Sequence, residues 1–139
     1  MSLETYTGSC HCGAIRFEAD LDLTEGSNRC NCSYCAKVRA WFAFAKGASR
    51  FRLIAGEGLS EYRWTPPEES EPHLTFSFCG TCGVRTFARG ELEALGGTFH
   101  AISVPTLDLM PEQFAEIPVR YINGRERRYD EAPPYPAAL

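Results

Sequence analysis

The sequence predicts a mainly β fold with short helical turns, stabilised by zinc, and three observations lead to this interpretation. Short runs of apolar and aromatic residues recur along the chain, as expected for strands. Helical signals are confined to short segments. Seven cysteines among 139 residues fall into three tight groups, which is typical of metal sites. The length suits one domain, so we expect residues 1–139 to form a single zinc-binding unit.

The expected strands differ in how they are covered. Residues 14–18 alternate apolar and polar side chains, which is typical of a strand with one buried face. Residues 40–45 are apolar throughout, so we expect both faces of this strand to be covered. Gly, Pro and Asn-Gly signals between the runs mark turns. Further strands are expected at residues 51–54, 59–64, 74–78, 84–88, 98–104 and 119–122.

Helical signals are weak and local. Residues 33–38 are expected to form one turn after the middle cysteines, and residues 91–95 another. Residues 111–114 resemble a helix start, because Pro is favoured at the first helical position. The Pro-rich tail from Ala132 is expected to be irregular.

Composition and charge narrow the classes of partner. The formal net charge is −4, whereas a nucleic-acid-binding protein would usually carry a basic surplus, so we expect no nucleic-acid partner. No apolar stretch approaches the length of a membrane span. Residues 1–8 are polar and lack the apolar core of a signal peptide. We therefore expect a cytoplasmic protein without membrane contact.

The cysteines are expected to bind metal rather than form disulfides. Their number is odd, which excludes complete pairing within one chain, and a reducing cytosol disfavours disulfides. Residues 10–12, 30–35 and 79–82 each bring thiolates close enough to share one ion from a tight turn. Gly13 and Gly83 directly follow two of these groups, where glycine allows a left-handed backbone.

The seven thiolates divide into four and three, which predicts two zinc ions per chain. Two pairs supply one closed tetrahedral site, and the group of three supplies a second site with one open position. An open position distinguishes catalytic zinc from structural zinc. We call these sets the closed cluster, formed by Cys10, Cys12, Cys79 and Cys82, and the open cluster, formed by Cys30, Cys32 and Cys35.

Three other interpretations of the cysteines compete with this division into a closed and an open zinc site. Cys79 and Cys82 have the spacing of a thioredoxin-like redox pair, but such a pair opens a helix and strand-like residues flank this one. All clusters could instead be structural, with His11, His73 or His100 completing the second site. A zinc deaminase would need a His/Cys-x-Glu motif followed by Pro-Cys-x-x-Cys, and the sequence has neither.

A zinc ion held by three thiolates favours thiol chemistry. Three anionic sulfur ligands leave the unit with a net negative charge, which makes it a poor Lewis acid for generating hydroxide. It still accepts a soft thiolate as a fourth ligand, and this favours deprotonation of a thiol near neutral pH. The open cluster therefore predicts a reaction of a thiol nucleophile rather than a hydrolysis.

Four segments resemble the glutathione-dependent formaldehyde-activating enzyme family, which also includes centromere protein V. The first is Cys10-His11-Cys12-Gly13 within residues 8–17. The others are residues 30–35, residues 78–83 and the segment 97–108. The resemblance extends from about Tyr6 to Tyr129, and its cysteine pattern is highly specific.

This resemblance implies an Mss4-like fold of folded β-sheets, with a structural zinc on the closed cluster and a catalytic zinc on the open cluster. It further implies a carbon–sulfur lyase that joins glutathione and formaldehyde to give S-hydroxymethylglutathione. The expected partners are thus a small-molecule thiol and a small aldehyde.

Cations near the clusters are candidates for binding the carboxylates of glutathione. They are Lys37, Arg39 and Arg85, with the two arginines preferred because a planar guanidinium pairs well with a carboxylate. Trp41, Phe42 and Phe44 could line a pocket, although such runs usually pack in a core.

Two other functions are kept as alternatives. A related thiol-dependent lyase or transferase would use the same site with another substrate. A non-catalytic binding module would use zinc only for stability, as Mss4-like relatives suggest by analogy. An open metal position favours an enzyme over such a module.

Overall fold

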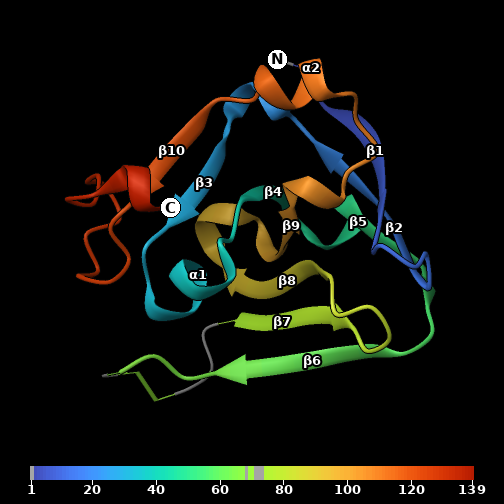
Figure 1. Ribbon diagram of the computed structural model, residues 1–139, viewed down its shortest axis with the longest axis horizontal. Coiled ribbons are helices and arrows are strands. Elements are labelled where there is room, and N and C mark those ends of the chain that lie inside the picture. The colour runs from blue at the N-terminus through green and yellow to red at the C-terminus, as the bar shows by residue number, and fades with distance from the viewer. Residues whose placement is uncertain (1, 68, 71–73) are drawn as a thin grey trace.

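Two β-sheets form the fold in the computed structural model, which describes residues 2–67, 69–70 and 74–139 (Figure 1). The mainly β class is confirmed. The three-stranded sheet has the order β1-β2-β5, and the seven-stranded sheet the order β10-β3-β4-β9-β8-β7-β6. The strands are β1 Glu4–Ser9, β2 Ile15–Leu21, β3 Ser27–Cys30, β4 Phe42–Lys46, β5 Phe51–Gly56, β6 Leu59–Trp64, β7 Leu74–Cys79, β8 Arg85–Leu92, β9 Gly97–Ser103 and β10 Val119–Ile122.

The two sheets are held together by a shared core. On β2 every second residue is buried, including Phe17, Ala19 and Leu21, as the alternation in the sequence predicts. These side chains pack in one cluster with Ala43 of β4 and Ile102 of β9, which belong to the other sheet. Burial of apolar surface therefore fixes the three-stranded sheet against the centre of the seven-stranded one.

Strand pairing brings the C-terminal part of the chain close to the middle cysteines. Strand β10 pairs with β3 in parallel, so Ile122 lies opposite Cys30. All other strand pairs of the described residues are antiparallel. In Figure 1 the helix α1, Ser33–Val38, lies between β3 and β8. The C-terminal segment is thus placed beside the open cluster by the sheet itself.

Every strand expected from the sequence is present, and two further strands were missed. β1 and β3 are rich in polar residues and show neither alternation nor an apolar run, so their pairing with neighbours decides their conformation. β4 is covered as expected, with Ala43 and Ala45 buried and both phenylalanines partly buried.

The expected helical turns are also present. Besides α1, a second short helix, α2, spans Pro111–Ala115, and Glu93–Leu95 forms a 3₁₀ turn. The tail ends in a 3₁₀ turn at Pro136–Ala138. Within the described residues, no helix has the length and apolar character that a membrane span requires.

Candidate metal centres and the cavity beside them

The four sulfurs of the closed cluster meet where turns from the two sheets come together. Cys10 and Cys12 lie on the turn between β1 and β2, and Cys79 and Cys82 on the turn between β7 and β8. All four sulfurs lie within 4.8 Å of one another. Cys12 Sγ is 3.7 Å from Cys10 Sγ and 3.6 Å from Cys79 Sγ. A tetrahedral zinc with Zn–S bonds of about 2.3 Å requires edges of about 3.8 Å, so this donor set fits zinc.

Backbone amides direct hydrogen bonds at the sulfurs of the closed cluster. The Ile15 amide donates to Cys10 Sγ at 3.3 Å, and the Cys82 amide donates to Cys79 Sγ at 3.4 Å. Amide donors lower the pKa of Cys79, and they lower that of Cys82 to about 6. Cys10, Cys79 and Ile15 form a small buried cluster. The Ala14 amide lowers the pKa of Cys12, but hydrogen bonding with Cys79 and Cys10 outweighs it and raises this pKa to about 11. The amides therefore favour the thiolates of Cys79 and Cys82, and the site is part of the core.

The open cluster lies at the junction of β3 and α1. Cys30 ends β3, Cys32 is the N-cap of α1, and Cys35 lies in the helix. Their sulfurs lie within 4.8 Å of one another. The Cys35 amide donates to Cys32 Sγ at 3.3 Å, and the Cys32 amide donates to Cys30 Sγ at 3.4 Å. The local helix start thus orients the sulfurs.

Ionisation of the three sulfurs of the open cluster is linked: the pKa of Cys30 is lowered, whereas hydrogen bonding with Cys30 raises the pKa of Cys32 and of Cys35. Hydrogen bonds from the thiols of Cys32 and Cys35, helped by backbone amides, lower the pKa of Cys30 to about 3. The same hydrogen bonds raise the pKa of Cys35, because its proton is shared with Cys30. Soft donors this close together form a set that a divalent cation would ionise fully.

No histidine or carboxylate of the described residues joins the open cluster. His11 is exposed on the turn of the closed cluster. His100 lies on β9, where its ring stacks on Phe51 at 4.0 Å, and its Nδ1 has no hydrogen-bond partner among the described residues. Burial lowers the pKa of His100 to about 4. His11 and His100 therefore do not supply a fourth ligand to the open cluster, as the alternative with two structural zinc sites would require. The third candidate, His73, lies outside the described residues.

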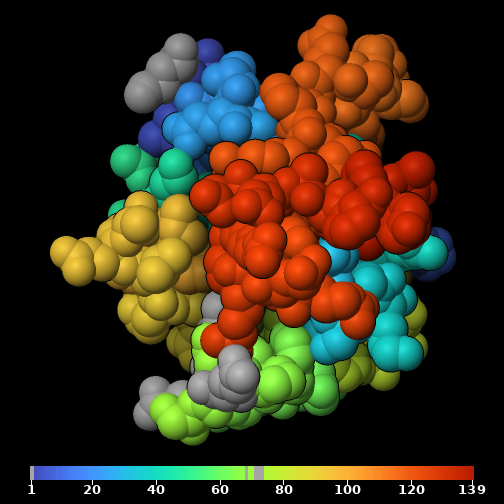
Figure 2. All heavy atoms as spheres, turned by 90° about the vertical axis from the view of Figure 1, so that its left-hand side faces the viewer, coloured from blue at the N-terminus to red at the C-terminus, as the bar shows by residue number. Residues whose placement is uncertain are grey.

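The C-terminal turn, residues 123–131, holds the loop of the open cluster. Asn31, between Cys30 and Cys32, donates from Nδ2 to Asn123 Oδ1 at 3.0 Å. The Arg125 amide donates to Asn31 Oδ1 at 2.9 Å, and Arg125 Nε donates to the Asn31 carbonyl at 3.1 Å. Figure 2 shows this C-terminal segment in red across the face that also carries α1 in cyan. The turn therefore fixes the backbone between two of the three cysteines.

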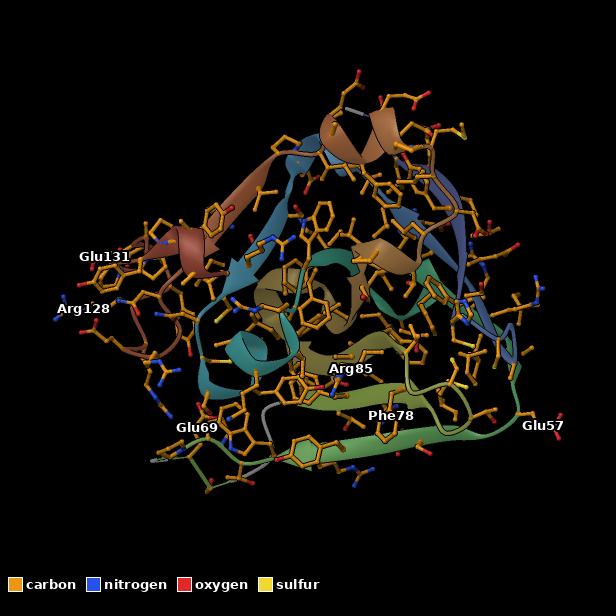
Figure 3. All side chains as sticks on the ribbon, viewed as in Figure 1. Glu57, Glu69, Phe78, Arg85, Arg128 and Glu131 are labelled. Atoms are coloured by element: carbon orange, nitrogen blue, oxygen red, sulfur yellow. The ribbon has the colours of Figure 1, made fainter. Side chains whose placement is uncertain are left out.

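Gly124 lies directly against the open cluster. A Cβ atom on Gly124 would collide with Cys30 Sγ and would touch Cys32 Cβ at 3.5 Å. The Gly124 amide is one of the donors that lower the pKa of Cys30. Arg128 and Glu131 of the turn face outward: Figure 3 shows them at its outer edge, where the two side chains lie 3.6 Å apart and are both exposed.

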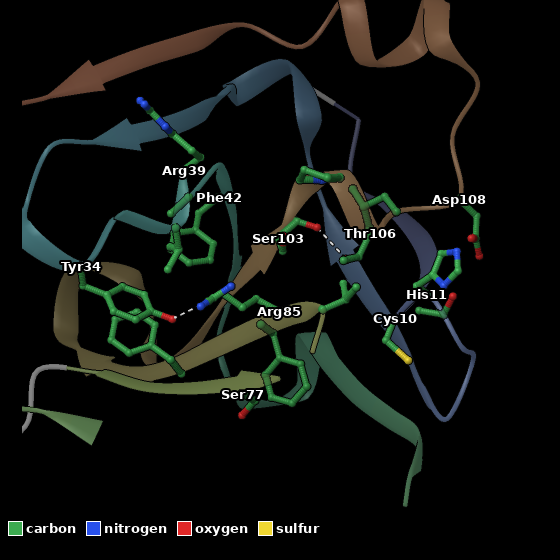
Figure 4. A pocket seen from close by; sticks show the side chains of 18 residues that line it. Cys10, His11, Tyr34, Arg39, Phe42, Ser77, Arg85, Ser103, Thr106 and Asp108 are labelled. Atoms are coloured by element: carbon green, nitrogen blue, oxygen red, sulfur yellow. Dashed lines mark hydrogen bonds between the residues drawn. The ribbon is translucent and has the colours of Figure 1, made fainter. Parts of the chain in front are cut away.

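A cavity of about 570 Å³ lies beside α1 and extends to the Cys10-His11 turn (Figure 4). This volume is typical of a small-molecule site. Phe42 and Phe76 supply apolar walls, and Arg39 and Arg85 also line the cavity. Arg85 Nε donates to Tyr34 Oη at 3.3 Å, and the Tyr34 ring stacks on Phe76 at 3.9 Å. Arg39 and Arg85, the two arginines that the sequence suggested as carboxylate-binding residues, therefore line the same cavity.

Arg39 occupies an unusual backbone position. It is the C-cap of α1 with φ 55°, in the left-handed region where glycine is usual. An arginine there costs conformational energy, which points to a use for its side chain. Lys37, by contrast, is exposed on α1 and does not line the cavity.

The aromatic run after α1 contributes to both the cavity and the core. Phe42 lines the cavity, whereas Phe44 packs against Phe99 in the core. Trp41 donates from Nε1 to Ser27 Oγ at 2.6 Å and packs against the other core cluster. Phe42 also packs against the core cluster that contains Phe99, so all three aromatic residues have core contacts and Phe42 lines the cavity in addition.

Sequence reasoning missed several residues that the fold brings to these sites. Tyr34 and Asp108 line the cavity, and Asn31, Asn123 and Gly124 surround the open cluster. The only signals for them were the position of Asn31 between two cysteines and the Asn-Gly pair, which marks a turn without naming its partner.

The metal content of the protein is expected to be two zinc ions per chain. Both donor sets have the sulfur spacing and the amide hydrogen bonds of thiolate metal sites. Elemental analysis of protein purified with zinc should approach this value. A weak chelator should remove the zinc of the open cluster first, because three protein ligands hold a metal less firmly than four. A value that stays at one in excess zinc would contradict the expectation.

Residues 5–122 match the model of the family described as glutathione-dependent formaldehyde-activating enzyme. A crystal structure of a Rhodobacter sphaeroides protein from a structural-genomics project is also similar. Its sequence is 28% identical, the TM-score is 0.63, and the match covers 82% of this chain and 99% of that one. The C-terminal turn that holds the open cluster follows the last residue of the family match.

Proposed function

The chain belongs to the glutathione-dependent formaldehyde-activating enzyme family, and on this premise we propose that it adds the thiol of glutathione to formaldehyde. A sulfur–carbon bond forms, the carbonyl π bond opens, and the thiol hydrogen ends on the former carbonyl oxygen. The product is S-hydroxymethylglutathione, and no oxidant or reductant is needed. The observation that best supports this proposal is a cavity with two guanidinium groups beside the helix of the open cluster.

Each cluster has a separate role in this proposal. The closed cluster would hold a structural zinc that joins the two sheets. Cys30, Cys32 and Cys35 would hold the catalytic zinc, which when bound supplies an electron-accepting centre that favours the ionised form of a thiol. The apolar rings of Phe42 and Phe76 would limit water in the cavity.

The two cavity arginines would bind the carboxylates of glutathione. Arg85 uses Nε to bond Tyr34, which leaves its two terminal amino groups without an acceptor among the described residues. Arg39 has no ion-pair partner among those residues either. Because Tyr34 is stacked on Phe76, the guanidinium of Arg85 is held in place before a ligand arrives. Such preorganisation reduces the entropy lost on binding.

Exchange of ¹³C-formaldehyde with its glutathione adduct tests the proposed reaction. Thiols add to formaldehyde without a catalyst, so the quantity to measure is the exchange rate by NMR, with and without the zinc-loaded protein. We expect clear acceleration by the wild-type chain and none by Cys32→Ser. Acceleration with another aldehyde but not with formaldehyde would assign the site to a related lyase or transferase. No acceleration with any aldehyde would favour a binding module.

Arg39→Gly is expected to weaken glutathione binding without destabilising the fold. Glycine suits the left-handed C-cap, so the melting temperature should stay the same or rise. Loss of a charged hydrogen bond costs about 1.5–3 kcal/mol, or roughly tenfold or more in affinity. Calorimetric titration with glutathione measures this.

The matched control is Arg127→Gly. Arg127 is the other non-glycine residue with positive φ among those described, at 58°, and it lies outside the cavity. This variant should bind glutathione as the wild type does, with zinc content checked in parallel. If both variants lost the same affinity for glutathione, Arg39 would act only through the net charge of the protein and not through contact with the ligand.

A further inference from the structure

The cavity carries charges of opposite sign on its two sides. Figure 4 shows Arg39 and Arg85 toward α1, and Asp108 with His11 at the other end. Asp108 follows the short 3₁₀ turn Val104–Thr106 that ends β9. A cavity polarised in this way favours a ligand that carries both signs of charge.

Contacts with β1 fix the position of Asp108. Its amide donates to the Thr7 carbonyl at 2.9 Å, and its Oδ2 accepts a hydrogen bond from Thr7 Oγ1 at 2.7 Å. Gly8 and Leu107 form a β-bridge next to this contact. No lysine or arginine of the described residues pairs with the carboxylate, and Oδ1 accepts no hydrogen bond from them. Asp108 is thus an oriented anion at the cavity wall without a cation.

The charges of glutathione complement this arrangement. The tripeptide has two carboxylates and one α-ammonium group, and the cavity offers two guanidinium groups and one carboxylate. We propose that Asp108 binds the α-ammonium of the γ-glutamyl residue and so makes the cavity selective for thiols that carry this group. The assignment rests on the proposed function and adds a specificity-determining residue to it.

The role in specificity can be separated from the structural role of Asp108. Asparagine keeps an oxygen that accepts the Thr7 hydroxyl, and its backbone amide is unchanged, so Asp108→Asn should fold normally. Only the negative charge is lost. Asp130→Asn is the matched control, because Asp130 is exposed and lies outside the cavity.

Calorimetric titration of the zinc-loaded full chain with two ligands tests the proposal. Glutathione carries the ammonium, and N-acetylglutathione lacks it. The wild type and Asp130→Asn should bind glutathione about tenfold more tightly than the acetylated form, as for loss of a charged hydrogen bond. In Asp108→Asn this preference should vanish, while the affinity for N-acetylglutathione stays the same.

Each other outcome overturns the proposal in a recognisable way. Equal affinity of the wild type for both ligands would exclude Asp108 as an ammonium site, and this result does not depend on any variant folding. A loss of both affinities in Asp108→Asn would mean that the residue only shapes the cavity. In both cases the wild type still binds glutathione, so the proposed function stands. If the wild type binds neither ligand, the proposed function fails together with the inference.

Discussion

Replacement of Cys79 by serine is expected to leave the protein unfolded or insoluble, whereas Cys32→Ser is expected to fold and to lose one zinc ion. Cys79 is fully buried, and its sulfur lies 3.6 Å from that of Cys12 across the junction of the two sheets. Structural zinc contributes on the order of 10 kcal/mol to folding. This is comparable with the whole stability of a small domain, about 5–15 kcal/mol, so the fold should not survive its loss.

The Cys32→Ser variant keeps most of the local structure. Cys32 is the N-cap of α1 and accepts a hydrogen bond from the Cys35 amide. Serine is among the best N-cap residues, so the helix start should persist even though a thiolate is lost. The loop is also held by Asn31 through its bond to Asn123. The variant should therefore be soluble, with one zinc ion and no activity.

Solubility, far-UV circular dichroism and zinc content distinguish the two variants. The expected pattern is an unfolded Cys79→Ser protein beside a folded Cys32→Ser protein. If both variants lost folding to the same extent, the two clusters would not have separate structural and catalytic roles. If Cys79→Ser folded normally, the two sheets would be held by their shared core alone.

The strands predicted from the sequence are those in which the order of apolar and polar residues reflects which side chains are buried. β2 alternates because one face packs on the core, and β4 is apolar because both faces are covered. β1 and β3 show neither alternation of apolar and polar residues nor an apolar run. Of the six residues of β1 only Gly8 is buried, and β3 is a polar strand formed by pairing with β10 and β4. Their conformation comes from partners distant in sequence, which local patterns do not encode.

The same distinction holds for the candidate sites. The spacing of cysteines is local, so the sequence alone suggested which thiolates share a turn. Asp108 and Gly124 gave no such signal. Asp108 reaches the cavity because its loop bonds Thr7, 101 residues away in sequence. Gly124 reaches Cys30 because β10 pairs with β3. Both placements depend on sheet topology.

Gly124→Ala is expected to weaken zinc binding at the open cluster and to leave the closed cluster unchanged. The added methyl group would collide with Cys30 Sγ, and neither backbone nor sulfur can move freely. The Gly124 amide donates to this sulfur, and Asn31 is bonded to both neighbours of Gly124, Asn123 and Arg125. Gly124 does not have positive φ, so alanine brings no backbone strain and the effect is purely steric.

The expected size of this effect follows from comparable changes around metal ligands. Alteration of a group next to a ligand typically lowers metal affinity about 10–100-fold. Competition with a chromophoric zinc chelator should show one site weakened by this factor and one unchanged, with the closed cluster as an internal control. Arg128→Ala is the external control, because it changes the same turn at an exposed side chain that contacts Glu131. If Gly124→Ala kept both sites at wild-type affinity, the C-terminal turn would not position Cys30, and the open cluster would depend on β3 and α1 alone.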